Sequence, residues 1–130
     1  MESINYFDLE NFKGLFLEDS FVLQIIEVPE LISFQVEFVL TEDHPEYKKP
    51  LDDEMYCYRF GEINFKNPKQ VIWKVKNQKA VSIDANGDND LGNIDLFFKS
   101  GDDYSLEGDW GCVIINCENL EVKLKAQSPN

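Results

Sequence analysis

An alternation of apolar and polar residues across positions 32–40, broken only at Val39, is the feature that most constrains the fold. The apolar positions of this segment are Ile32, Phe34, Val36, Phe38 and Leu40. Because successive side chains of a β-strand point to opposite faces, a period of two predicts a strand with one face on a core and the other in water. A second alternation, at positions 120–125, predicts a similar strand near the C-terminus.

The rest of the chain is divided into short strand-like segments by turns. Strands are predicted at residues 21–28, 55–66, 71–76, 81–83, 94–99, 104–107 and 112–117. Gly61 is expected at a bulge or bend, since glycine inside a strand often marks one. On the segment that follows, Val71, Trp73 and Val75 are expected to face the core together.

Short strands with frequent turns predict a mainly β chain. We expect a single antiparallel β-sandwich or partly open barrel that forms one domain over residues 1–130. The only helix signal lies in residues 4–17, where Ser3 is a candidate cap and Gly14 a candidate stop, and it predicts a short N-terminal helical segment. A chain of this length can bury a core without a disulfide or metal.

The chain is strongly acidic, with 25 Asp and Glu against 12 Lys and Arg and a formal charge of −13. This balance favours a basic partner and disfavours binding to nucleic acid or to an anionic membrane surface. His44 is the single histidine and Arg59 the single arginine. With no phosphate-binding glycine loop and no nucleophile–base spacing, the sequence favours a non-catalytic protein without a cofactor.

The three cysteines, Cys57, Cys112 and Cys117, are an odd number, so at least one is unpaired. If Cys112 and Cys117 share one strand, they lie roughly 16 Å apart, which is too far for a disulfide. No basic and apolar leader and no membrane-spanning run is visible. We therefore expect three free thiols and a cytoplasmic location.

The loop over residues 84–95 has some features of a calcium site. Oxygen ligands alternate at Asp84, Asn86 and Asp88, and Asp95 falls at the twelfth position. The sixth position carries Asn89 instead of glycine, and Asp95 is shorter than the usual glutamate. A solvated turn is therefore the preferred interpretation, with a weak calcium site as the alternative. A metal role for His44 is disfavoured because no paired ligand spacing accompanies it.

Acidic residues are concentrated between positions 84 and 109, where there are eight acids and one base. A binding surface is predicted from the acids of this region and its tryptophan: Asp88, Asp90, Asp102, Asp103, Asp109 and Trp110. Turn-forming neighbours flank Trp110, so its ring is expected to close one end of the fold or to line a pocket. Five lysines between positions 66 and 79 are expected to protect an exposed sheet edge.

Several phrases, taken in order, carry a resemblance: Gly14 to Ser20 (GLFLEDS), His44 to Tyr47 (HPEY), Tyr56 to Arg59 (YCYR), Gly92 to Asp95 (GNID) and Leu106 to Gly111 (LEGDWG). From residue 14 to about residue 122, the chain resembles a group of small bacterial β-rich proteins of uncharacterised function. It is similar, over fewer features, to small acidic immunity proteins that neutralise bacterial toxins. The first resemblance implies a β fold and no active site, and the second implies a basic toxin as partner.

Together these features predict a non-catalytic cytoplasmic binding protein with an acidic surface, of which an immunity protein that masks a basic toxin is one form. The alternative is a small-ligand or metal-binding β domain, or an enzyme, with its site near Trp110 and the loop 84–95. A third interpretation is a homodimer joined through a sheet edge or face.

Overall fold

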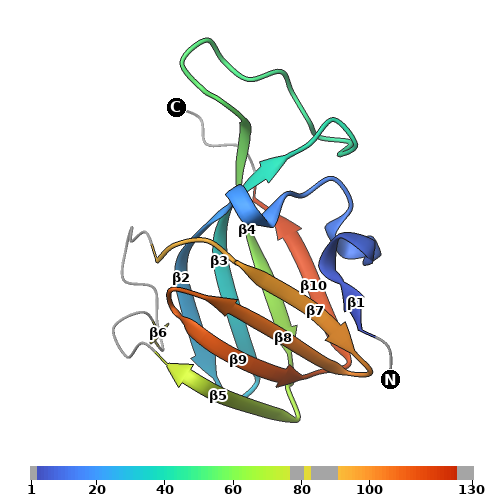
Figure 1. The fold of residues 1–130 in the computed structure, drawn as a ribbon, viewed down its shortest axis with the longest axis vertical. Helices are drawn as coiled ribbons and strands as arrows, with labels where there is room; N and C mark the ends of the chain where they lie inside the picture. The colour runs from blue at the N-terminus through green and yellow to red at the C-terminus, as the bar shows by residue number, and fades with distance from the viewer. Residues whose placement is uncertain (1–2, 77–80, 83–90, 126–130) are drawn as a thin grey trace.

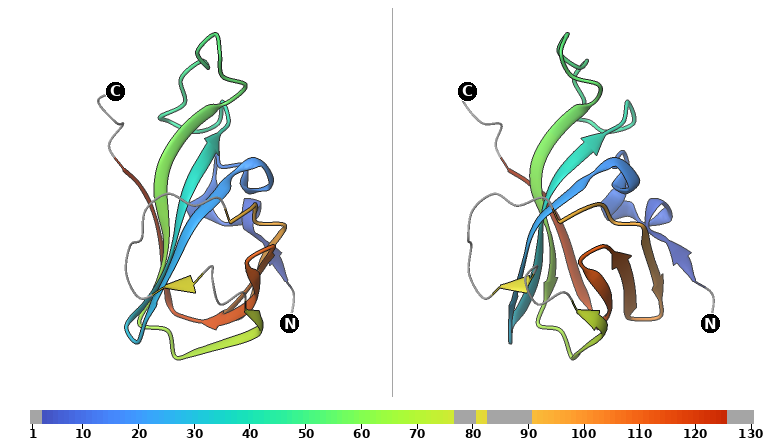
Figure 2. Two further views of the ribbon diagram at one scale, coloured as in Figure 1. Left: turned by 90° about the vertical axis from the view of Figure 1, so that its left-hand side faces the viewer. Right: turned by 60° about the vertical axis from the view of Figure 1, so that its left-hand side comes forward.

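The structure, a computed structural model, describes residues 3–76, 81–82 and 91–125, and its strands form a two-layered sandwich (Figures 1 and 2). The front sheet, which faces the viewer in Figure 1, has the strand order β1 (Ile4–Asn5), β7 (Leu96–Ser100), β8 (Asp103–Gly108), β9 (Gly111–Asn116) and β5 (Gln70–Lys76). The back sheet has the order β10 (Asn119–Leu124), β4 (Cys57–Lys66), β3 (Leu31–Leu40), β2 (Phe21–Val28) and β6 (Val81–Ser82). All pairings are antiparallel except that of β6 with β2. The predicted mainly β sandwich is confirmed.

The alternating segment forms β3, which lies in the middle of the back sheet. Its five predicted inward residues are at most 2 % exposed. Between the two sheets, aromatic rings of one layer pack against aromatic rings of the other. Phe65 of β4 packs edge-on against Tyr104 of β8 at 5.4 Å between ring centroids, and it stacks near Phe97 of β7 at 6.2 Å. The core is therefore shared by both sheets.

The N-terminal helical segment consists of three single 3₁₀ turns: η1 (Tyr6–Asp8), η2 (Glu10–Phe12) and η3 (Leu17–Asp19). Apolar residues recur here at every third position, from Tyr6 through Leu9 and Phe12 to Leu15. The turns are interrupted by non-helical residues at Leu9 and Lys13, and all four apolar side chains nevertheless pack against the core. Among the described residues, no helix has the length and apolar character needed to cross a membrane.

Two predicted details of the strands are wrong. Val75 does not share the inward face of Trp73, because a bulge at Lys74 shifts the pairing of β5 with β9 and turns Val75 to the outside. Gly61 is not at a bulge, since β4 keeps regular pairing there with both β3 and β10. A Cβ atom on Gly61 would lie 2.7 Å from the Phe38 ring, so the glycine makes room for a core side chain.

The chain crosses repeatedly between the layers. After β4 in the back sheet it enters β5 in the front sheet, and it returns to the back sheet for β6 before β7, β8 and β9. At the top of Figure 1, β3 and β4 project beyond the front sheet, and residues 41–56 connect them. We call this end of the molecule the apical end.

Candidate functional site

The described acids of the predicted surface lie at two ends of one strand. Asp102 precedes β8 and Asp103 begins it, whereas Asp109 follows its other end, roughly 20 Å away at the rise of an extended strand. Trp110 is fully buried, where its ring packs against Phe34 at 5.1 Å. Its indole N–H donates to the carbonyl of residue 93 at 3.1 Å. Trp110 therefore closes the core from inside, and Asp88 and Asp90 lie outside the described residues.

The calcium candidate is described only in part. Asp84, Asn86 and Asp88 lie outside the described residues, and Asp95 is an exposed residue immediately before β7. The backbone N–H of Asp95 donates to the Glu107 carbonyl at 2.8 Å, which ties it to the β7–β8 pairing. Within residues 3–76, 81–82 and 91–125, no group of three or more His, Cys, Asp or Glu side chains is placed to hold a metal ion.

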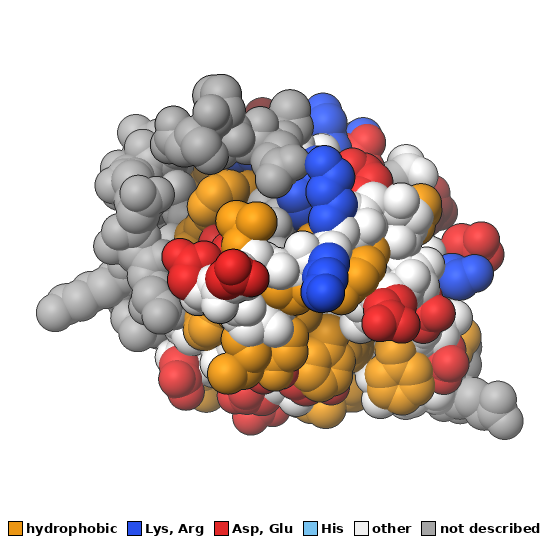
Figure 3. All heavy atoms as spheres, turned by 90° about the horizontal axis from the view of Figure 1, so that it is seen from above, with side chains coloured by type: hydrophobic (Ala, Val, Ile, Leu, Met, Phe, Trp, Pro, Cys, Tyr) orange, Lys and Arg blue, Asp and Glu red, His pale blue; other side chains and the backbone are white. Residues whose placement is uncertain are grey.

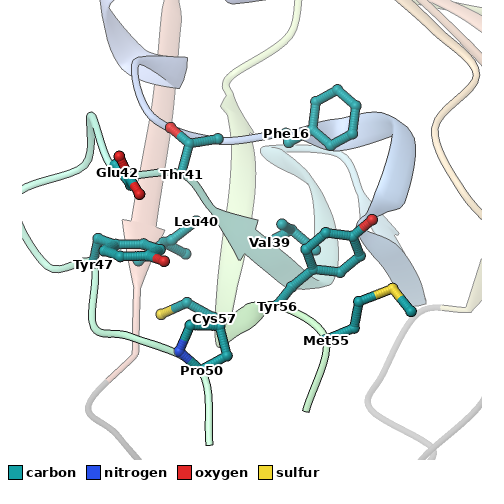
Figure 4. Close-up of a pocket in the computed structure, with 10 residues that line it drawn as sticks. All are labelled: Phe16, Val39, Leu40, Thr41, Glu42, Tyr47, Pro50, Met55, Tyr56 and Cys57. Atoms are coloured by element: carbon teal, nitrogen blue, oxygen red, sulfur yellow. The ribbon is translucent and has the colours of Figure 1, made fainter.

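The apical end carries a pocket of about 260 Å³ that sequence analysis did not anticipate (Figure 4). Its walls are mainly apolar and come from the residue before η3, the end of β3, the connection 41–56 and the start of β4. The apolar members are Phe16, Val39, Leu40, Tyr47, Pro50, Met55 and Tyr56, and the polar members are Thr41, Glu42 and Cys57. In Figure 4, Tyr47 and Glu42 lie on one side and Phe16, Tyr56 and Met55 on the other. We call this hollow the apical pocket.

Backbone hydrogen bonds fix one wall of the apical pocket. The Phe16 N–H donates to the Val39 carbonyl at 3.0 Å, and the Thr41 N–H donates to the Gly14 carbonyl at 2.8 Å. Gly14 has a φ of +80°, and a Cβ atom there would lie 2.6 Å from the His44 side chain. Only glycine adopts this conformation at low cost and permits that approach. Gly14 therefore holds the start of the 41–56 connection against the 3₁₀ segment.

The opposite wall is held by side chains of β4. Arg59 forms an ion pair with Glu46 at 2.9 Å and donates to the Lys125 carbonyl at 2.7 Å. The Sγ atom of Cys57 accepts a hydrogen bond from the Lys48 N–H at 3.5 Å. These contacts secure the middle of the 41–56 connection, so the pocket has two fixed walls.

A second hollow, of about 380 Å³, adjoins the apical pocket and shares Phe16 and Thr41 with it. Its other walls come from the segment that carries η1, η2 and η3 and include Phe7, Lys13 and Glu18. The two hollows together are called the apical groove. A third hollow, of about 130 Å³, shares Pro50 and Cys57 with the apical pocket on its far side.

Charge changes sign along this end of the molecule. The apical groove is lined by the acids Glu18, Glu42 and Asp43 and by one base, Lys13. The third hollow is lined instead by Arg59, Lys48 and Lys49 together with two glutamates. Figure 3, which looks down on this end, shows apolar side chains gathered with acidic groups around them and lysines nearby. An apolar groove with an acidic lining suits a ligand that combines apolar and cationic groups.

Two titratable groups near the groove have shifted pKa values. Burial lowers the pKa of His44, and the nearby Arg59 lowers it further while Glu46 opposes the change. The Nδ1 atom of His44 also accepts the Glu46 N–H at 3.0 Å, so the ring is neutral and structural. The Asp19 carboxylate beside the Tyr56 hydroxyl raises the pKa of Tyr56, which remains a neutral phenol.

The three cysteines are free in the structure. Cys57 lines the apical pocket, Cys112 is half-buried on the front sheet, and Cys117 is buried. Burial raises the pKa of the Cys117 thiol, which therefore stays protonated at neutral pH. Buried in this way, Cys117 lacks the accessible and electropositive setting that activates a thiolate.

A sequence signal for the apical groove exists in hindsight. Sixteen residues without strand or helix connect β3 to β4, which is longer than most connections in compact domains. Within them Leu51 and Met55 are apolar but strongly exposed. A long connection that exposes apolar residues indicates a binding loop more directly than the acid-rich turns do.

Comparisons with the models of known protein families, with curated proteins and with solved structures find no match to this chain.

Proposed function

We propose that the protein is a non-catalytic cytoplasmic binding protein whose apical groove captures a basic partner protein. The observation that carries the proposal is the apical groove itself, an apolar hollow with fixed walls and an acidic lining. Exposed anchors at its mouth, Phe16 at 40 % and Met55 at 77 % exposed, offer apolar area to a partner side chain. Immunity by masking a basic toxin is the specific form of this function that the resemblance implies.

In the proposed complex, charge would mainly set the association rate, and apolar contacts would mainly set the dissociation rate. A chain of charge −13 attracts a cationic partner from a distance, which accelerates association. Apolar side chains that fill the groove would then govern dissociation. The free carboxylates of Glu42 and Asp43, which form no ion pair with any described residue, are available to the partner's cations.

The test compares two acidic surfaces with equal charge change. A partner is first recovered from the native host, and its association rate is then measured with the double variant Glu42→Gln, Asp43→Asn and with the matched control Asp102→Asn, Asp103→Asn. We expect the groove variant to slow association several-fold more than the control does. The difference should shrink as salt rises, because the Debye length falls from about 10 Å at 0.1 M to about 3 Å at 1 M.

Substitution of the anchors tests the second half of the proposal. Phe16→Ser and Met55→Ser should increase the dissociation rate and leave the association rate nearly unchanged. The proposal fails if the recovered partners are acidic, if the control variant slows association as much as the groove variant, or if the purified protein turns over a small molecule. The last result would favour the ligand-binding or enzymatic alternative.

A further inference from the structure

The outer face of the front sheet is unusually apolar. Strand register places Ile72 of β5 beside Ile114 of β9, and the same row continues through Ser105 of β8 to Phe98 of β7. Directly paired residues share a face of the sheet. The row behind the sheet, formed by Trp73, Val113, Leu106 and Phe97, faces the core, so the Ile72 row faces outward.

A second outward row extends the apolar area. Val75 pairs with Cys112, Cys112 with Glu107, and Glu107 with Leu96. The outer face thus presents six apolar side chains in two neighbouring rows: Ile72, Val75, Leu96, Phe98, Cys112 and Ile114. Val75 is 63 % exposed, Leu96 44 % and Ile72 42 %. Contiguous exposed apolar surface of this kind typically marks an interaction site.

The charges around the face are arranged in two halves. At the β5 edge stands Lys74, which forms no ion pair with any described residue, whereas Lys76 lies over the inward Trp73 ring and pairs with Glu27 of the back sheet. At the β7 and β8 side stand the exposed acids Asp95 and Glu107, which likewise form no ion pair with described residues. Glu107 is the only charged residue among the eight positions of the two outward rows.

We infer that the outer face of the front sheet is the interface of a symmetric dimer of this chain. A two-fold axis that lies in the plane between two such faces and runs parallel to the strands sets the β5 half of one copy over the β7 half of the other. Lys74 of each copy then meets the acids of its partner, and the apolar rows meet each other. A basic partner protein would match only the acidic half, whereas a second copy matches both.

The net charge strengthens the choice of this face. Two chains of charge −13 repel one another, so association is least opposed where the surface is nearly uncharged or carries both signs. The dimer face is distinct from the apical groove, because it is formed by β5, β7, β8 and β9 and the groove by η1 to η3, β3 and residues 41–57. The dimer and the proposed partner binding are therefore separable by experiment.

Sedimentation equilibrium of the full chain, at concentrations from about 1 μM to about 1 mM, tests the inference. We expect a reversible dimer, and we expect Ile72→Asp and Leu96→Asp, each as a single variant, to raise its dissociation constant at least about tenfold. The matched control is Phe60→Asp, which adds a charge at an equally exposed apolar residue, 46 % exposed, on β4 of the back sheet. A monomer throughout this range, or a dimer weakened as much by the control, would overturn the inference.

Thiol labelling of the unaltered chain supplies a readout that needs no substitution. Cys112 lies within the dimer face, whereas Cys57, similarly half-buried, lies at the apical pocket. Alkylation of Cys112 should slow as protein concentration rises, and alkylation of Cys57 should not. Equal and concentration-independent rates at the two thiols would contradict the dimer face even if the chain associates through another surface.

Discussion

The outer faces of the two sheets cover the same core with opposite chemistry. On the back sheet, Asn64 accepts the Ser33 hydroxyl at 2.6 Å and donates to Glu62 and Glu121 at 3.1 and 3.3 Å. Gln35 joins this group through the same Ser33 hydroxyl at 2.8 Å. On the front sheet the corresponding positions are Ile72, Ile114 and Phe98, with Ser105 between them.

This difference indicates that one outer face of the sandwich stabilises the single chain while the other is suited to association with a second surface. The polar side chains of the back sheet satisfy one another within a single chain, so that face has no need of a partner. The apolar side chains of the front sheet gain nothing from water and gain most when another surface covers them. Each of the following measurements tests one part of the comparison, beginning with the largest expected effect.

The core common to both sheets should dominate stability over either outer face. Phe65→Ala removes a fully buried ring that contacts aromatic rings of both layers, and it should lower the free energy of unfolding by about 4 kcal/mol. Urea unfolding measures this. The control on the same strand is Phe60→Ala, at an exposed ring, which should cost less than about 1 kcal/mol. Equal effects would mean that the outer faces carry as much stability as the core.

The polar network on the back sheet should stabilise the single chain, whereas the outward Ser105 of the front sheet should contribute little to its stability. Asn64→Ala leaves the buried Ser33 hydroxyl without its acceptor, so it should cost about 2 kcal/mol of unfolding free energy. Ser105→Ala, at a half-buried outward position of β8, should change stability by no more than about 0.5 kcal/mol. Urea unfolding at a protein concentration below the dissociation constant of the dimer distinguishes the two variants. A larger loss of unfolding free energy for Ser105→Ala than for Asn64→Ala would mean that the outer face of the front sheet, and not that of the back sheet, stabilises the single chain.

The smallest expected effect concerns Glu121. The hydrogen bond from Asn64, followed by that from Lys66, lowers the pKa of the Glu121 carboxyl. A carboxyl whose folded pKa is depressed stabilises the fold above its unfolded pKa, and that contribution disappears as pH falls through the folded pKa. Carboxyl titration by NMR should find the Glu121 pKa below its ordinary value. It should rise in Asn64→Ala and in Lys66→Met, whereas an unchanged value in both variants would contradict the network.

Strand positions were predictable because their signal is local. The alternation in residues 32–40 and the apolar run in residues 21–28 mark β3 and β2 within one residue, since each period of two requires a strand with one buried face. The 3₁₀ turns were read only as a short helical segment, because the three-residue spacing from Tyr6 to Leu15 was not distinguished from a helical period.

The details that failed depend on contacts distant in sequence. A bulge was predicted at Gly61, but the glycine instead makes room for the Phe38 ring. Val75 was predicted to face inward, but the β5 register shifts at Lys74 and turns it outward. Trp110 is flanked by turn residues, yet the position of Phe34 draws its ring inside. The apical groove needs the path of residues 41–56 over η3, which no local pattern specifies.

The repeated crossing of the chain between the layers has a consequence for folding kinetics. β1 pairs with β7 about 90 residues later, and one edge of β4 pairs with β10, the last strand of the chain. Folding rates fall as contacts become more distant in sequence, so this topology places the chain among slow-folding β proteins. On the ribosome, neither sheet can be completed from the N-terminal half alone. β2, β3 and β4 can pair as they emerge, but the outer edge of β4 stays open until β10 has been synthesised, so the last strand completes the sandwich.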